Sequence, residues 1–262
     1  MIPQIPSDVE MPHYRLPRKL LLGLPWSVAA LWPRSIARDA RLGMAGVRPE
    51  PEVLGAEHIP LRGPALVACN HYSRPGFGAW WLALAITAAV AARRDPDADP
   101  EIHWVMTAAW TFHDSAWRQR LLTPITRRVF DRAARVYGFV TMPPMPPDPD
   151  EVEARAVAVL RTVRLARWAA RDGGMLGLAP EGRDTPGGLG DPPKGAGEFI
   201  ALLVQAGLPV LPVGVTERRG RLHVSFGPLF VPEIPPNRVD RDSAVAQQVM
   251  TAIARQVPQH GP

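Results

Sequence analysis

Short apolar runs alternate along the chain with longer stretches in which apolar and charged residues repeat at helical spacing. The short runs predict strands at residues 65–69, 102–106, 136–142, 175–179, 208–215 and 222–226. The longer stretches predict helices at 75–92, 114–134, 148–172 and 199–206, and from about residue 240 to the tail. This alternation predicts an α/β fold with a mixed, largely parallel sheet flanked by helices and preceded by an N-terminal helical segment. The turn signal Arg219-Gly220 between the last two runs adds one antiparallel hairpin.

Glycines and prolines predict where these elements begin and end. Pro75 suits the first turn of a helix, because its missing N–H would be unsatisfied there anyway. Gly138 falls inside the expected strand 136–142. Asp148-Pro149 predicts the start of the next helix, and Gly173-Gly174 predicts its end. The apolar stripe of that helix is expected at Val152, Ala156, Val159, Val163 and either Ala166 or Ala170.

We expect the first 45 residues to be an N-terminal helical segment distinct from an α/β domain over residues 46–262. Helix is expected over 16–45 in two pieces, broken near Pro25 and Pro33. Residues 20–32 are apolar, contain two tryptophans and have basic residues on both sides. Such a segment fits a helix lying in a membrane interface, and it fits equally well a helical hairpin packed on the domain. No run reaches the ~20 apolar residues that a membrane-spanning helix needs.

The net charge limits the classes of partner to be considered, and the cysteine content indicates the redox state of the compartment. The formal net charge is +5 and the pI is about 10.1, which allows anionic lipid, an anionic substrate or nucleic acid as a partner. No lysine-rich tail or aromatic-basic repeat supports nucleic acid, so we expect none. The single cysteine, Cys69, excludes an internal disulfide and fits a reducing compartment. We expect a cytoplasmic protein associated peripherally with a membrane.

Two polar clusters follow expected strands and are the best candidates for chemistry. His71 comes directly after the strand 65–69, where a histidine can act as a general base or can simply satisfy a loop. Pro180-Glu181-Gly182-Arg183 follows the strand 175–179 and should lie on the same sheet edge. Its glycine turn and arginine fit an anion site, with a charged surface loop as the alternative. His113-Asp114 is a weaker base–acid pair, and no residues have metal-ligand spacing.

Four blocks in this order resemble the glycerolipid acyltransferase family that includes the 1-acylglycerol-3-phosphate acyltransferases. The first block is Asn70-His71-Tyr72-Ser73, and the second is the Gly-apolar strand at 137–142. The third is Pro180-Glu181-Gly182-Arg183 followed by Lys194-Gly195, and the fourth is the Pro-Val repeat at 208–213. The resemblance covers about residues 60–230.

The resemblance implies an O-acyltransferase of phospholipid and glycerolipid metabolism. His71 would take a proton from a hydroxyl of a lipid-like acceptor, whose oxygen attacks an acyl thioester of coenzyme A or of acyl-carrier protein. His71 and Glu181 are the catalytic candidates under this hypothesis. The substrate-binding candidates are Asn70, Ser73, Arg74, Gly182, Arg183 and Lys194. The mechanism needs no cofactor and no metal.

The chain departs from the family pattern at three positions. Gly76 stands where the family has the aspartate that orients the histidine, and loss of such an acid costs ~10⁴ in turnover in the serine-protease example. Pro144 stands about where the second block has its phosphate-binding arginine, and Arg183 lies one position earlier than the family's arginine. These departures favour an acceptor without the usual phosphate or a reduced activity. The alternative function is a catalytically impaired relative that binds acyl chains or lipids without turnover.

Overall fold

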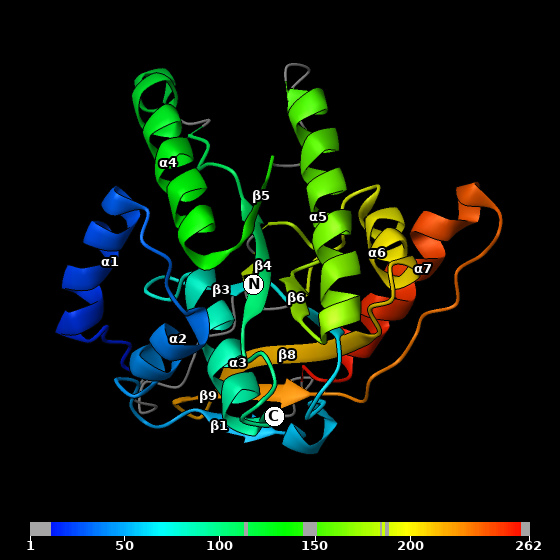
Figure 1. The fold of residues 1–262 in the computed structure, drawn as a ribbon, viewed down its shortest axis with the longest axis horizontal. Coiled ribbons are helices and arrows are strands. Elements are labelled where there is room, and N and C mark those ends of the chain that lie inside the picture. The colour runs from blue at the N-terminus through cyan, green and yellow to red at the C-terminus, as the bar shows by residue number, and fades with distance from the viewer. Residues whose placement is uncertain (1–11, 113–114, 144–150, 184, 187–188, 258–262) are drawn as a thin grey trace.

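A computed structural model describes residues 12–112, 115–143, 151–183, 185–186 and 189–257. Seven strands form one sheet in the order β1-β9-β8-β2-β6-β4-β5, and only the β8–β9 pair is antiparallel. Helices flank this sheet (Figure 1). The predicted α/β class, with a mixed and largely parallel sheet and N-terminal helices, is therefore confirmed.

The elements alternate along the chain as their patterns predict. The strands of the large sheet are β1 (Glu52–Leu54), β2 (Ala65–Cys69), β4 (Ile102–Thr107), β5 (Val140–Met142), β6 (Met175–Leu178), β8 (Val210–Arg218) and β9 (Arg221–Phe226). A second, small sheet pairs β3 (Tyr72–Ser73) with β7 (Thr185–Pro186) in parallel. The α-helices are α1 (Arg18–Ala30), α2 (Ile36–Met44), α3 (Ala79–Arg93), α4 (Ala116–Tyr137), α5 (Val152–Asp172), α6 (Ala196–Gln205) and α7 (Arg238–Ala254). A 3₁₀ turn, η1 (Ala56–His58), follows β1.

Strand β2 lies at the centre of two hydrophobic cores. Its side chains alternate between the two faces of the sheet, because successive residues of a strand point in opposite directions. Ala65, Val67 and Cys69 pack in the core formed with α2 and α3. Leu66 and Ala68 pack in the core formed with α5, α6 and α7. All five residues are buried, which explains why this strand reads as a continuous apolar run.

Three predicted boundaries are wrong, and glycine or proline geometry explains each of them. Pro25 lies inside α1 instead of ending it, because a proline removes only one helical hydrogen bond and this one belongs to the carbonyl of the exposed Leu21. Pro75 lies in a turn before α3 and not in its first turn. Gly138 has φ +69° and ends α4, so the strand that follows begins only at Val140.

The apolar stripe predicted for α5 holds only toward its C-terminal end, where Ala166 is buried and Val163 packs against the core. Val152 is exposed, and the buried positions are Ala158, Thr162, Ala166 and Ala169. These small side chains let the helix pack closely on the sheet, and the hydroxyl of Thr162 is satisfied by the carbonyl of Ala158 at 2.8 Å. The helix ends at Gly173 in the left-handed conformation, as its sequence predicts. Its expected start at Asp148-Pro149 lies outside the described residues.

The N-terminal helices contact the domain at different places. Helix α2 packs along α3, and Asp39 on α2 accepts hydrogen bonds from Arg34 at 2.6 and 2.9 Å and from Tyr137 at 2.8 Å. Helix α1 lies beside α4 (Figure 1). The break between α1 and α2 falls around Pro33, as predicted. Within the described part of the chain, no helix is both long enough and apolar enough to cross a bilayer.

Candidate active site at the ends of strands β2 and β6

The segment that carries His71 is held first by Asn70. This side chain is buried, donates a hydrogen bond to the carbonyl of Val215 at 2.9 Å, and accepts one from the amide of Val215 at 2.7 Å. The two bonds continue the pairing of β2 and β8 one residue beyond the strand. Asn70 thus works as a backbone mimic that fixes the direction in which the chain leaves the sheet.

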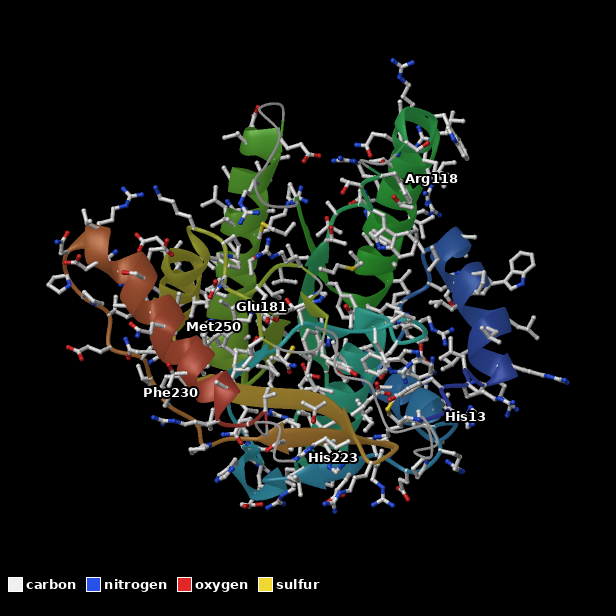
Figure 2. All side chains as sticks on the ribbon, turned by 180° about the vertical axis from the view of Figure 1, so that it is seen from behind. His13, Arg118, Glu181, His223, Phe230 and Met250 are labelled. Atoms are coloured by element: carbon white, nitrogen blue, oxygen red, sulfur yellow. The ribbon has the colours of Figure 1, made fainter. Side chains whose placement is uncertain are left out.

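Glu181 joins the two candidate segments. Its carboxylate accepts a hydrogen bond from the backbone amide of His71 on one oxygen and from that of Gly190 on the other. The amide of Thr185 donates to the carbonyl of His71 at 3.0 Å, so the chain around His71 is bonded on both sides. Because β2 and β6 are adjacent parallel strands, their carboxyl ends bring His71 and Glu181 to one edge, as expected. Figure 2 shows Glu181 near the middle of the molecule.

Burial dominates the electrostatics of this carboxylate. Glu181 is 1% exposed, and its burial raises the pKa of the carboxyl group against the lowering effects of the Gly190 and His71 amides. Burial likewise raises the pKa of the neighbouring Cys69 thiol to about 12, with a smaller contribution from Glu181. Cys69 is therefore a thiol at neutral pH and not a candidate nucleophile.

A second buried carboxylate, Glu217 at the end of β8, binds the other side of this segment. It accepts two hydrogen bonds from the guanidinium of Arg74, one from the hydroxyl of Tyr72 at 3.0 Å, and one from the hydroxyl of Tyr14 at 2.6 Å. The side chain of Glu217 is 3% exposed and that of Arg74 is 21% exposed. The hydrogen bonds to Glu217 raise the pKa of Arg74 and keep it charged, whereas burial raises the pKa of Tyr72 to about 12.

The turn at 74–77 explains what Gly76 does. The amide of Phe77 donates to the carbonyl of Arg74 at 2.9 Å, and Gly76 has φ +82° at the third position of the turn, after a proline. That combination is typical of a type II turn. A Cβ atom placed on Gly76 would have Arg74 Nη1 as its nearest neighbour, at 3.6 Å. A carboxylate at this position would therefore lie close to the guanidinium of Arg74.

The remaining substrate-binding candidates do not gather as tightly. Ser73 lies in β3 and is partly buried, while Gly182 and Arg183 are exposed beyond Glu181. Gly182 has φ +63°, which its turn requires. Lys194 is exposed immediately before α6. Their roles stay predictions.

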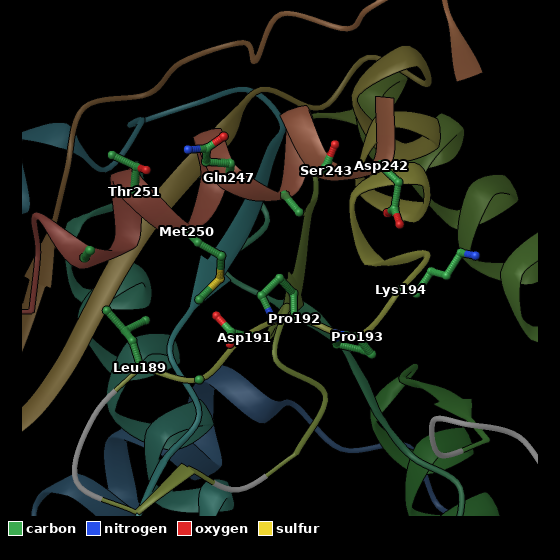
Figure 3. Close-up of a pocket in the computed structure, with 13 residues that line it drawn as sticks. Leu189, Asp191, Pro192, Pro193, Lys194, Asp242, Ser243, Gln247, Met250 and Thr251 are labelled. Carbon is green, nitrogen blue, oxygen red and sulfur yellow. The ribbon is translucent and has the colours of Figure 1, made fainter. Parts of the chain in front are cut away.

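Lys194 borders a groove of about 660 Å³ between the segment 189–194 and helix α7 (Figure 3). Gly190 is the lining residue that connects the groove to the candidate site, because its amide binds Glu181. The N-terminus of α6 beside it already has an anionic partner. Asp242 accepts hydrogen bonds from the amide of Gly195 at 2.7 Å and from that of Glu198 at 3.1 Å. The amides at this helix start are thus paired with the protein's own carboxylate.

Sequence reasoning missed Glu217, Tyr14 and Asp242, because each acts on residues far away in the chain. The only local signal was that Glu217 follows an apolar run, as Asn70 and Glu181 do. The weaker candidates His113 and Asp114, and the departure at Pro144, lie outside the described residues. Over the described ranges, His, Cys, Asp and Glu side chains form no group of three or more that could hold a metal ion.

Comparisons with known proteins find a similar fold among solved structures. No family model matches the chain, and no curated protein matches its sequence. Among solved structures, the chain is similar to the 1-acyl-sn-glycerophosphate (LPA) acyltransferase PlsC from Thermotoga maritima. The identity is 15%, the match covers 94% of this chain and 86% of that chain, and the TM-score is 0.49.

Proposed function

We propose that this protein is an O-acyltransferase that moves a fatty acyl group from an acyl thioester to a hydroxyl of a lipid-like acceptor. The observation that carries the proposal is the Glu181 clamp. A buried carboxylate from the Pro-Glu-Gly-Arg block binds the backbone of His71 in the Asn-His block. Two blocks that are 110 residues apart in the chain thus share one edge of the sheet. This shared edge is what the ends of adjacent parallel strands predict, and it supports treating the two blocks as one site.

The proposed reaction assigns one role to each group. The imidazole of His71 removes the proton of the acceptor hydroxyl as its oxygen attacks the thioester carbonyl. The carbon–sulfur bond then breaks, the thiol leaves with a proton, and the acceptor carries the new ester. Glu181 acts as a positioning residue, because its contact is with the backbone amide of His71. The donor in this proposal is coenzyme A or acyl-carrier protein.

The proposal includes a membrane surface as the source of the acceptor. Helix α1 exposes Leu22 and Trp26 to solvent at 71% and 73%. Exposed apolar side chains of this size on a helix with basic residues at its start favour a position in the membrane interface. The protein would then be a cytoplasmic enzyme bound peripherally to the bilayer.

Acyl transfer tests the proposal directly. Purified protein is mixed with acyl-coenzyme A and a panel of lysophospholipids and non-phosphorylated lipid alcohols, and the released thiol and the lipid product are both measured. We expect at least one acceptor to be acylated, and His71→Ala to lower the rate by ~10²–10⁴. His223→Ala, which alters a histidine on β9, serves as the matched control and should keep wild-type activity. Equal rates for wild type and His71→Ala with every acceptor and with acyl-carrier protein as donor would exclude the reaction.

A second candidate function is binding of acyl chains or lipids without turnover. Two features favour it: Gly76 replaces the orienting aspartate, and Glu217 already pairs with Arg74. This candidate predicts saturable binding of a fluorescent fatty acid with no thiol released. Any turnover that depends on His71 excludes it.

A further inference from the structure

Helix α4 exposes apolar side chains on the face that an ordinary surface helix keeps polar. Trp117, Leu121 and Ile125 are 63%, 61% and 54% exposed. They are spaced four residues apart, so they lie on successive turns of one face. The buried residues of α4, such as Thr123 and Ala134, lie away from this stripe. The apolar stripe therefore has no partner among the described residues.

The stripe lies in the half of α4 that projects from the sheet. Figure 1 shows that α4 and α5 both project beyond the sheet, and the label of Arg118 in Figure 2 marks the projecting half of α4 as the N-terminal one. The nearby Trp110 is also exposed, and its ring packs edge-on against Phe130 of α4 at 5.1 Å between centroids. A projecting helix end with an exposed tryptophan, Trp117, is accessible to a flat surface, which a recessed face is not.

Helices α4 and α1 are attached to each other. The guanidinium of Arg132 on α4 donates to the carbonyls of Val28 and Ala29 at the C-terminal end of α1, with Nε 2.9 Å from the oxygen of Val28. The two helices lie side by side in both Figure 1 and Figure 2. Their exposed apolar residues therefore belong to one part of the molecule.

The charges on α1 and α4 indicate which kind of surface the exposed apolar residues would bind. The residues of α1 and α4 include eight lysines and arginines and a single acid, Asp131. Asp131 already accepts a hydrogen bond from Thr141 at 3.1 Å. Exposed Arg120 and Arg128 lie within a turn of the stripe. Exposed tryptophan and leucine beside arginine, with almost no acid, complements a bilayer that carries anionic headgroups.

We propose that the outer face of α4, defined by Trp117, Leu121 and Ile125, is a docking surface for a bilayer containing anionic lipid. The role of this docking, which is to bring a lipid acceptor to the site, rests on the proposed function. The docking itself rests on the α4 face. It makes α4 a second membrane contact, in addition to α1.

Vesicle flotation of the full chain tests the surface without any catalytic step. The vesicles contain phosphatidylcholine alone or phosphatidylcholine with phosphatidylglycerol. The variant is Leu121→Glu/Ile125→Glu, and the matched control is Val157→Glu/Leu160→Glu, which places the same charges on an exposed apolar pair of α5. We expect wild type and control to float with the anionic vesicles and the α4 variant to lose about tenfold or more in partitioning. Phosphatidylcholine alone should bind all three proteins less.

Two outcomes would overturn the inference. One is equal flotation of the α4 variant and the α5 control. The other is a wild-type dimer in solution that the α4 variant converts to a monomer without a change in flotation, which would assign the face to a second copy of the chain. Acyl transfer to a short-chain, water-soluble alcohol separates this test from that of the proposed function. The α4 variant should match wild type in that assay, and if all proteins are inactive the flotation result still stands.

Discussion

Glu181 and Glu217 are two buried carboxylates that bind opposite sides of the same segment, and their partners differ. Glu181 accepts hydrogen bonds from the backbone amides of His71 and Gly190, and a hydrogen bond from the Thr185 side chain also lowers its pKa. Glu217 binds the guanidinium of Arg74 and two tyrosine hydroxyls. The negative charge of Glu217 is balanced by the positive charge of Arg74, whereas that of Glu181 is balanced by hydrogen-bond dipoles.

Glu217 and Glu181 therefore hold the segment around His71 in two different ways. A carboxylate paired with arginine is held in one geometry, and removal of either member leaves the charge of the other uncompensated. A carboxylate held by amides in a buried site has a raised pKa, so its charge depends on pH. We therefore expect the contribution of the Glu181 clamp to stability to change with pH.

The largest effect should come from removing the carboxylate paired with Arg74. Glu217→Ala leaves the Arg74 guanidinium without its carboxylate and both tyrosine hydroxyls without their acceptor. Because the Arg74 side chain keeps some contact with water, we expect a loss of about 2–3 kcal/mol in unfolding free energy, below the ~3–5 kcal/mol typical of fully buried pairs. Urea denaturation measures it. Arg74→Leu added to Glu217→Ala should cost less than the sum of the two single changes, and strict additivity would show that the pair is not coupled.

Replacing the amide-bound carboxylate should cost less. Glu181→Gln keeps the shape, but it turns one acceptor into an NH₂ group facing a backbone N–H, which costs about 1–3 kcal/mol. Glutamine and glutamate have nearly the same shape, so we expect the backbone around His71 to keep its position in the variant. Urea denaturation at neutral pH measures the difference, and an unchanged midpoint would contradict the clamp.

The same variant should also change the pH dependence of stability. Burial raises the pKa of Glu181, so the native state keeps this proton to a higher pH than the unfolded chain does. Its contribution to stability is complete below the pKa of the unfolded chain and falls as the pH rises through the native pKa. Wild type should therefore exceed Glu181→Gln by most at acid pH, and the difference should shrink toward neutral pH. A difference that grows with pH would reverse the sign and contradict the raised pKa.

The smallest effect should come from the turn between the two carboxylates. Gly76→Ala places a side chain at φ +82° with space around it, so only backbone strain of about 1 kcal/mol is expected. Gly76→Asp should pair with Arg74 and leave acyl transfer at the level of Gly76→Ala. A gain in activity for the aspartate over the alanine would show that the turn rearranges to orient His71.

The sequence predicted the sheet well because strand and helix periods are local properties. The buried run of β2 and the end of α5 at Gly173 follow from patterns within a few residues. The errors occurred where a local signal allows two structures. A Pro-Gly pair fits both a helix start and a type II turn, and at residues 75–76 the positive φ of Gly76 decides for the turn.

The sequence indicated which residues belong to the candidate site, but it did not indicate which of them contact one another. The motifs indicated His71 and Glu181, and the parallel sheet implied a shared edge. That Glu181 binds the backbone amide of His71, or that Arg74 is paired with Glu217, could not be inferred, because these contacts join residues more than 100 positions apart.

The sequence by itself determined the alternation of elements and the residues at the strand ends, because periodicity and turn chemistry act over a few neighbours. The tertiary structure decided which charges are already used inside the protein. Arg74 and Arg132 look alike in the sequence as available cations, yet one binds Glu217 and the other binds the end of α1. It also decided that the apolar residues of α3 are mostly buried while a stripe of them on α4 faces solvent. Burial is a property of what packs against a helix, and no local pattern contains it.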